Sequence, residues 1–192
     1  MRTMPGRVFT ALLIHAQQQY GYLTPADARE LDIDPTQLRL MAARHTLEHR
    51  SHGLYRMPMV APTQLDAYME AVMWTGRRGV LSHETALDLH ELCDVNPSAI
   101  HLTLPRAFRT RKAVPEIYRV HRFDLDPAEI GWHEGIPIVT PERAILGGIE
   151  QALGWQLIDQ AIDAARARGL ITQPAADRLT AMRHQPQAPP HG

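Results

Sequence analysis

Two helix-start signals that lie only about ten residues apart constrain this chain most. Residues 24–27, TPAD, supply a side-chain oxygen that can cap a helix, a proline suited to the first turn and an acid near the positive end of the helix dipole. Residues 34–37, DPTQ, repeat this combination of a capping side chain and a proline. The first of these helices must therefore end near Leu31, and the spacing predicts two short helices joined by a tight turn, as in a helix-turn-helix.

The segment before these signals is predicted to be a helix as well. Val8, Leu12 and Ala16 recur at helical spacing, and Gly21 is suited to end the helix. The arginines that precede this segment imitate the start of a signal peptide. Because the apolar stretch is brief and continues into a patterned domain, we interpret it as the first helix of that domain.

After the third helix the pattern changes to strand-like alternation and turns back at residues 51–53, SHG. Leu47 and Leu54 can pack on the helices while their neighbours project, so we interpret residues 1–60 as a winged helix-turn-helix domain. In that arrangement one helix enters the major groove and the hairpin reaches the DNA backbone. The residues expected to contact DNA are Thr36, Gln37, Arg39, Leu40 and Arg44 on the helix and Arg50, Ser51, His52 and Arg56 on the hairpin.

The charge distribution supports this interpretation weakly. The whole chain has a net charge of -1, but seven arginines against five acids give residues 1–58 a formal charge of +2. Of the twenty basic residues only Lys112 is a lysine, so contacts to phosphates would use the bidentate arginine fork. Winged helices also serve as protein-binding modules, and that alternative stays open.

Residues 64–184 are predicted to form a second domain after a short linker at residues 61–63. Helical spacing is followed by alternation at residues 100–104 and 118–121, by a hairpin within residues 130–138 and by further helices. The fold class expected for the chain is therefore α+β, with a small antiparallel sheet and several helices in the second domain. Residues 185–192, rich in proline and glutamine, are expected to form a flexible tail.

The most basic segment of the chain lies between the two strands of this second domain. Residues 105–122 carry six basic residues against one acid, a formal charge of +5. We expect a phosphate-binding arm, because arginine and lysine neutralise the nucleic-acid backbone whatever the base sequence. Binding of an acidic protein surface, or a simply solvated loop, are the alternatives. The residues selected for DNA contact here are Arg106, Arg109, Arg111 and Lys112.

No catalytic residue, metal site or cofactor is expected. His83-Glu84 begins like a zinc-protease motif, but that motif needs a second histidine at position 87, which is Leu87. His83 and His90 lie seven residues apart on one helical face, which permits joint ligation, although surface or capping roles are the preferred interpretation. The acids of Asp124-Leu125-Asp126 precede Pro127 and are interpreted as a turn.

The location expected for the protein is the cytoplasm. The single cysteine, Cys93, excludes an intramolecular disulfide framework and a cysteine-based zinc site, and it suits a reducing compartment. No apolar run approaches the length that spans a bilayer, so no membrane association is expected.

Three stretches, in this order, resemble the AbiEi family of antitoxins from bacterial type IV toxin-antitoxin systems. They are GYLTPADARELDIDPTQLRLMAARHTLEHRSHGLYRMP, then AVMWTGRRGVLSHETALDLHELCDVNPSAIHLTLP, then WHEGIPIVTPERAIL. Taken together, the stretches extend over most of the chain.

The resemblance implies an N-terminal winged helix that binds inverted repeats in the promoter of its own operon, and a C-terminal domain with antitoxin activity. It also implies an AbiEii-like nucleotidyltransferase as the toxin, and DNA contacts by residues 36–44 and 50–56 assisted by Arg109 and Arg111. Some relatives carry nuclease-like domains, but Lys112 has no acid two residues before it, so we expect no enzyme activity. A monomer or a homodimer would suit repeated sites.

Two alternatives remain at this point. The chain could be an adaptor that does not bind DNA and sequesters a toxin by direct contact. It could also be an enzyme acting on nucleic acid or on a modified toxin, a hypothesis that draws only on His83, Glu84, His90, Asp124 and Asp126.

Overall fold

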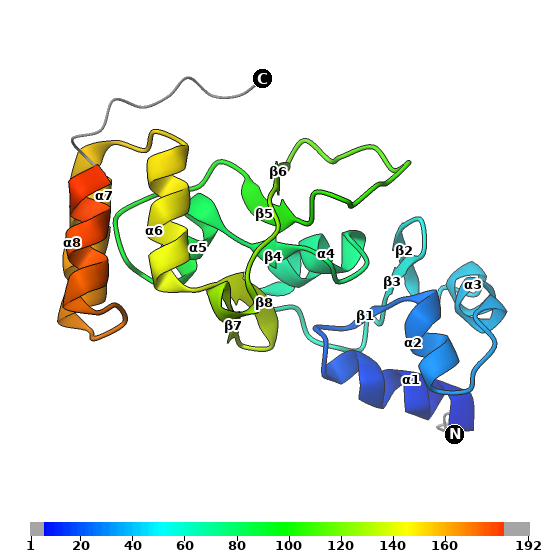
Figure 1. Cartoon of the computed structure of the whole chain (residues 1–192). Helices are drawn as coiled ribbons and strands as arrows, with labels where there is room; N and C mark the ends of the chain where they lie inside the picture. The colour runs from blue at the N-terminus through cyan, green and yellow to red at the C-terminus, as the bar shows by residue number, and fades with distance from the viewer. Residues whose placement is uncertain (1–5, 183–192) are drawn as a thin grey trace. The chain divides into compact units, whose positions relative to one another are not determined.

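The computed structural model describes residues 6–182 and shows two compact units, residues 1–77 and 78–192. Helices and strands occur in both units, and this confirms the α+β fold class (Figure 1). The predicted tail at residues 185–192 lies outside the described residues.

The first unit contains the helices and the hairpin that the sequence pattern predicts. Its elements are α1 (Arg7–Gln17), β1 (Tyr22–Leu23), α2 (Pro25–Glu30), α3 (Thr36–Ala43), β2 (Glu48–Ser51), β3 (Leu54–Arg56) and α4 (Asp66–Trp74). The three strands form an antiparallel sheet in the order β1-β3-β2. Strand β1 was not predicted, because two residues are too few to show alternation. Leu12, Leu38 and Leu47 lie in the core beneath these elements.

The helix-start signal at residues 24–27 works as expected, whereas the one at residues 34–37 marks the start of a helix without capping it in the same way. At the start of α2 the Thr24 hydroxyl accepts from the Asp27 N–H, and the Asp27 carboxylate accepts from the Thr24 N–H at 2.6 Å, which completes a capping box around Pro25. At the start of α3 the N-cap residue is Pro35, which caps nothing with its side chain, and the Asp34 carboxylate before it accepts from the Thr36 N–H at 2.8 Å. These local bonds explain why two helices begin so close together.

The boundary between the units lies later in the chain than the linker expected at residues 61–63. Helix α4 belongs to the first unit. Its Glu70 accepts a hydrogen bond from the Tyr22 hydroxyl at 2.7 Å, and its Asp66 accepts one from Arg56 at 2.9 Å. Helical spacing identifies an apolar face but does not say which core covers it, so the pattern alone could not assign α4.

The carboxylate of Asp27 is fully buried and joins three parts of the first unit. It accepts hydrogen bonds from Thr24 at the start of α2 and lies 3.1 Å from the His15 ring nitrogen of α1. It also forms an ion pair with Arg77, which follows α4. Burial alone would raise the pKa of Asp27, but the hydrogen bonds from Arg77 and Thr24 and the charge of Arg77 outweigh it and hold this pKa below its usual value.

Replacing this carboxylate should destabilise the first unit. We expect Asp27→Ala to lower the free energy of unfolding by roughly 3 kcal/mol at neutral pH, because the donors lose a buried acceptor. The folded-state pKa is depressed, so this stabilisation is present above the unfolded pKa of about 3.9 and is lost as pH falls through the folded pKa. Urea unfolding of both proteins between neutral and acidic pH measures the difference.

Asp32→Asn is the matched control, because Asp32 is exposed and its φ of 55° is one that asparagine tolerates. Equal stability of Asp27→Ala and the control would contradict the role given to Asp27.

The second unit has one five-stranded sheet and a group of helices. Its elements are β4 (Val80–Leu81), α5 (His83–Leu89), β5 (Ile100–Leu104), β6 (Tyr118–Arg122), η1 (Pro127–Glu129), β7 (Ile130–His133), β8 (Ile136–Val139), α6 (Pro141–Glu150), α7 (Trp155–Ala167) and α8 (Gln173–Ala181). The strand order is β6-β5-β4-β8-β7. The predicted hairpin of β7 and β8 is confirmed, and Glu134 and Gly135 at its turn both have positive φ.

The expectation of an antiparallel sheet in this unit is wrong, because the sheet is mixed. Strands β5 and β6 run parallel, as do β4 and β8. A parallel neighbour requires a connection of about a dozen residues or more, and the segment from residue 105 to 117 provides it. Alternation of apolar residues shows where a strand lies but not its direction.

Two adjacent glycines allow close packing around α6. A Cβ atom at Gly148 would lie 3.0 Å from Ile158 of α7 and 3.2 Å from Leu87 of α5. A Cβ atom at Gly147 would lie 2.9 Å from the ring of His83. The missing side chains therefore let the start of α5 approach the backbone of α6.

Candidate nucleic-acid interface

Helix α3 exposes the face that the sequence predicts. Gln37, Arg39, Leu40 and Arg44 are exposed, whereas Leu38 is fully buried in the core. Thr36, at the first position of the helix, is half-buried. The burial of Leu38 orients the helix so that its exposed face presents an amide, an apolar side chain and two guanidinium groups.

The hairpin of β2 and β3 presents only part of the set expected there. His52 is exposed at the turn, and the Arg50 side chain is 45% exposed while it forms an ion pair with Glu70 at 3.1 Å. Ser51 is half-buried. Contacts made by the hairpin would therefore come from Arg50 and His52.

The prediction that Arg56 projects from the hairpin is wrong. Its side chain is buried and donates hydrogen bonds to the Asp66 carboxylate at 2.9 Å and to the Val60 carbonyl oxygen at 3.0 Å. Strand β3 is the middle strand of its sheet, and the chain after it folds back over Arg56. This arginine joins α4 to the sheet and is not available to DNA.

Arg56 should therefore matter for stability. We expect Arg56→Ala to lower the free energy of unfolding of the first unit by about 1.5–3 kcal/mol, because the variant removes hydrogen bonds to a charged, half-buried acceptor. Arg29→Ala, at an exposed position of α2, is the control and should change stability little. Urea unfolding measures both, and no loss of stability in Arg56→Ala would contradict this role.

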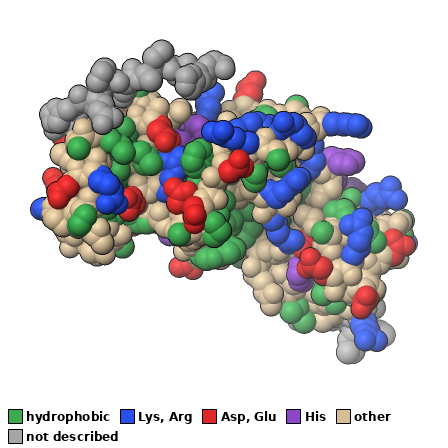
Figure 2. Space-filling view, viewed as in Figure 1, with side chains coloured by type: hydrophobic (Ala, Val, Ile, Leu, Met, Phe, Trp, Pro, Cys, Tyr) green, Lys and Arg blue, Asp and Glu red, His purple; other side chains and the backbone are tan. Residues whose placement is uncertain are grey.

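The basic segment between β5 and β6 is anchored by an aromatic side chain. Phe108 is buried, with the guanidinium of Arg78 4.5 Å and that of Arg122 5.9 Å from its ring centre. Arg122 also donates to the Phe108 carbonyl oxygen at 2.5 Å. Basic side chains gather over this segment (Figure 2). The contacts of Phe108 hold the backbone of the segment in place between the strands.

The predicted arginines of this segment differ in what they do. Arg109 donates to the carbonyl oxygens of Arg106 and Phe108 at 2.6 and 3.0 Å, so it shapes the loop. Arg106 is exposed but its guanidinium lies 5.9 Å from the centre of the Phe123 ring, Arg111 is exposed, and Lys112 is half-buried. Arg111 is therefore the residue best placed for a contact with phosphate.

Of the two acids interpreted as a turn, only Asp126 lies at one. The Asp126 carboxylate accepts from the Ala128 N–H at 2.8 Å at the start of η1, and the Asp124 carboxylate accepts from the Arg106 N–H at 2.9 Å. Both side chains bond backbone N–H groups, but Asp124 does so to the segment after β5 and not within a local turn.

Three histidines of the second unit form a cluster that the sequence interpretation missed. The rings of His83 and His121 stack with centres 3.6 Å apart, and His101 Nδ1 lies 3.0 Å from His121 Nε2. Each ring offers a nitrogen within 4.8 Å of those of the other two, an arrangement that can hold a metal ion. His90, weighed earlier as a ligand beside His83, instead bonds the Val139 carbonyl oxygen at 2.8 Å.

Burial governs the protonation of this cluster. Desolvation, with smaller effects of His121, His101 and Arg143, lowers the pKa of His83 to about 2. Desolvation, followed by the effects of His101, Arg119 and Arg143, lowers the pKa of His121 to about 4. The pKa of His101 is also lowered, chiefly by burial. All three rings are therefore neutral at neutral pH and carry lone pairs.

A second group of possible ligands, His15, Asp27 and Glu30, lies in the first unit. The Asp27 oxygens there already bind Thr24 and Arg77. This group is better explained by the network that holds the helices.

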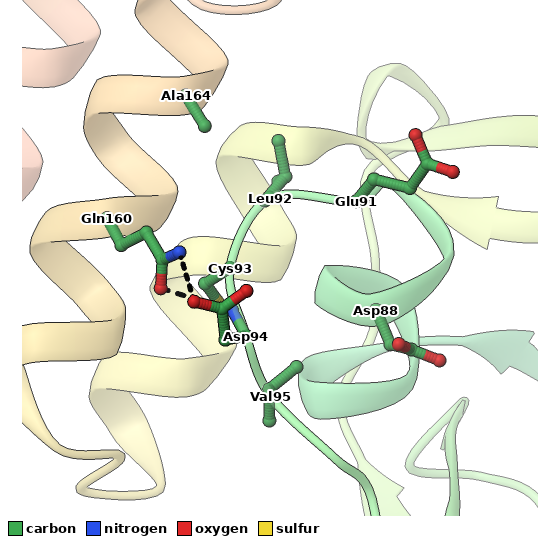
Figure 3. Close-up of a pocket in the computed structure, with 8 residues that line it drawn as sticks. All are labelled: Asp88, Glu91, Leu92, Cys93, Asp94, Val95, Gln160 and Ala164. Carbon is green, nitrogen blue, oxygen red and sulfur yellow. Dashed lines mark hydrogen bonds between the residues drawn. The ribbon is translucent and has the colours of Figure 1, made fainter.

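A shallow groove of about 450 Å³ lies between α7 and the loop after α5 (Figure 3). Asp88, Glu91 and Asp94 line it, and Asp94 bonds Gln160 at 2.8 Å. Its acidic lining is unsuited to the phosphates of nucleic acid, so this groove is not a candidate for contact with them.

Comparison with known proteins gives information on the fold. No family model matches the chain, and no curated protein matches it. Among solved structures, the crystal structure of the RV2827C protein from Mycobacterium tuberculosis aligns with a TM-score of 0.54 at 16% sequence identity, over 98% of this chain and 85% of that one. At this identity the likeness extends to the fold and not to function. Among the helices of residues 6–182, none combines the length and apolar character needed to cross a membrane.

Proposed function

We propose that this chain is a DNA-binding autorepressor that acts as the antitoxin of a type IV toxin-antitoxin system. The observation that carries the DNA-binding part is the exposed face of α3, with Arg39 and Arg44 held outward by the buried Leu38. The antitoxin part rests on the resemblance of the sequence to the AbiEi family.

The arrangement of the first unit supports a winged helix-turn-helix. Helices α2 and α3 are joined by a tight turn, and an antiparallel hairpin follows α3 and pairs with β1. An exposed helix with arginines suits the major groove, where a guanidinium can donate two hydrogen bonds to a guanine. In the same arrangement Arg50 and His52 of the hairpin would contact the DNA backbone.

The basic segment of the second unit would add contacts that do not depend on sequence. Arg111 and its basic neighbours lie on a loop held by Phe108, so little conformational entropy is lost when they bind phosphates. The proposed partners are thus operator DNA with inverted repeats and an AbiEii-like nucleotidyltransferase toxin. One chain at each repeat, or a homodimer, would both fit such an operator.

Removing the two arginines of α3 should abolish specific binding. We expect Arg39→Ala/Arg44→Ala to weaken binding to DNA from upstream of the gene by about 30-fold to roughly 25,000-fold, because each of the two lost base contacts costs about 1–3 kcal/mol. Binding to unrelated DNA should fall much less. Fluorescence anisotropy with both DNAs at a fixed salt concentration measures the ratio.

Arg29→Ala again serves as the control, since it removes one positive charge, half of what the double variant removes, from an exposed position of α2. Unchanged operator affinity in the double variant would reject α3 as the recognition helix. A stable complex with the toxin but no DNA binding by the unmodified chain would favour the adaptor hypothesis in place of the repressor.

Removing Arg111 should have a different effect. We expect Arg111→Ala to weaken binding to operator and unrelated DNA alike, and to reduce the slope of log affinity against log salt by about 1, because one phosphate contact is lost. Arg166→Ala, at an exposed position of α7, is the matched control. A salt series for the three proteins measures the slopes, and identical slopes would exclude the basic segment from the interface.

A further inference from the structure

We propose that His83, His101 and His121 form a binding site for a transition-metal ion, with Zn²⁺ as the ion that suits it. This inference concerns the second unit and does not depend on the proposed function. It rests on the position of the three rings, on the groups that orient His83 and on the space that Gly147 leaves beside it.

The mixed sheet brings two of the histidines together. Strands β5 and β6 are parallel neighbours, with His101 opposite Arg119 and Thr103 opposite His121. The two histidines are therefore offset by two positions on one face of the sheet. His83 begins α5 directly after β4, the other neighbour of β5. Two adjacent strands and the helix that follows the next strand of the sheet thus contribute to one cluster.

The spacing of the ring nitrogens suits one ion. Zinc binds histidine nitrogen at about 2.0–2.1 Å, so two ligands of a tetrahedral ion are separated by roughly 3.3–3.4 Å. The observed separation of His101 Nδ1 and His121 Nε2 is 3.0 Å, and the third ring offers a nitrogen within 4.8 Å of both. Rotation of the stacked rings about their side-chain bonds would bring one nitrogen of each ring within bonding distance of a single ion. The ion would then take the place of the hydrogen bond between His101 and His121.

A hydrogen-bond chain orients the third ligand. His83 Nδ1 lies 2.9 Å from the Ser82 hydroxyl oxygen, which also accepts from the Thr103 hydroxyl at 2.8 Å. Because that oxygen can accept from Nδ1–H, the Nε2 lone pair of His83 stays available to a metal. Metal-binding histidines are commonly held in this way through their second nitrogen.

The backbone around His83 is also adapted to its position. His83 has a φ of 52°, a left-handed value that is unfavourable for a residue with a side chain. Its ring lies against α6, where a Cβ at Gly147 would come within 2.9 Å of Cδ2 and 3.3 Å of Nε2. A strained backbone and a glycine opposite the ring both serve to keep this imidazole beside the other two.

The surrounding charges permit a divalent ion. Glu84 lies close enough to favour positive charge at His101, whereas Arg119 opposes it. The buried Arg143 is paired with Glu150 at 2.9 Å and with Glu129 at 3.6 Å, so much of its charge is offset. Three imidazoles leave a fourth position on a tetrahedral ion, and His121 is only half-buried, so water can reach that position.

The experiment uses the full chain without an added histidine tag, treated with a chelator and then titrated with Co²⁺ and with Zn²⁺. We expect one ion per chain, the visible absorption of four-coordinate Co²⁺, and loss of that absorption when Zn²⁺ is added. Zinc at a hundredfold excess over its Kd should raise the melting temperature by roughly 5–10 °C. Absence of stoichiometric binding would overturn the proposal.

Substitutions locate the site. His101→Asn and His121→Asn should each weaken Zn²⁺ binding at least tenfold, and Gly147→Ala should weaken it by displacing His83. His133→Asn, at a half-buried position of β7 in the same unit, is the control and should bind as the unmodified chain does. Circular dichroism confirms that each variant is folded. Equal affinity of His121→Asn and the control would overturn the proposal.

A measurement without substitutions covers the case in which the buried variants do not fold. The side-chain ¹⁵N signals of the histidines are recorded before and after one equivalent of Zn²⁺ is added to the unmodified chain. Of the eleven histidines, three should show the shift of a metal-bound nitrogen. A shift confined to other histidines, identified by assignment of the signals, would overturn the proposal.

Discussion

The buried carboxylate of Asp27 is the interaction on which the first unit depends. It ties the start of α2 to α1 through His15 and to the segment after α4 through Arg77. A unit of this size has a small apolar core, and apolar contacts alone would hold its helices together only weakly. A buried acceptor that several helices share therefore adds to the stability of the unit. Helix α3 follows α2 through a tight turn, and the direction of its exposed face therefore depends on this network.

The second unit also contains a polar cluster, within a mostly apolar core. His83, His101 and His121 meet beside α6, where Gly147 leaves room for a ring. Buried polar groups need partners, and here Ser82 and the neighbouring rings supply them. The basic segment connects the two strands that carry His101 and His121. The same sheet therefore positions the residues of the proposed metal site and those of the proposed phosphate contacts.

Local signals in the sequence identified most elements, because their physical causes are local. Caps and prolines marked the starts of α2, α3 and α6, and alternation marked β5 and β6. The buried position of Arg56 had no such signal, since it depends on a chain segment that folds back over β3. The assignment of α4 to the first unit likewise depends on which surface covers its apolar face.

The sequence by itself determined the α+β class, the helix starts, the hairpins and the exposed residues of α3, because caps, turns and periodicity act over a few residues. Tertiary structure alone decided the parallel pairing of β5 with β6, and with it the meeting of His101 and His121. Strand direction and register are set by connections and packing between distant segments. Residues 83, 101 and 121 therefore become neighbours only when the sheet is assembled.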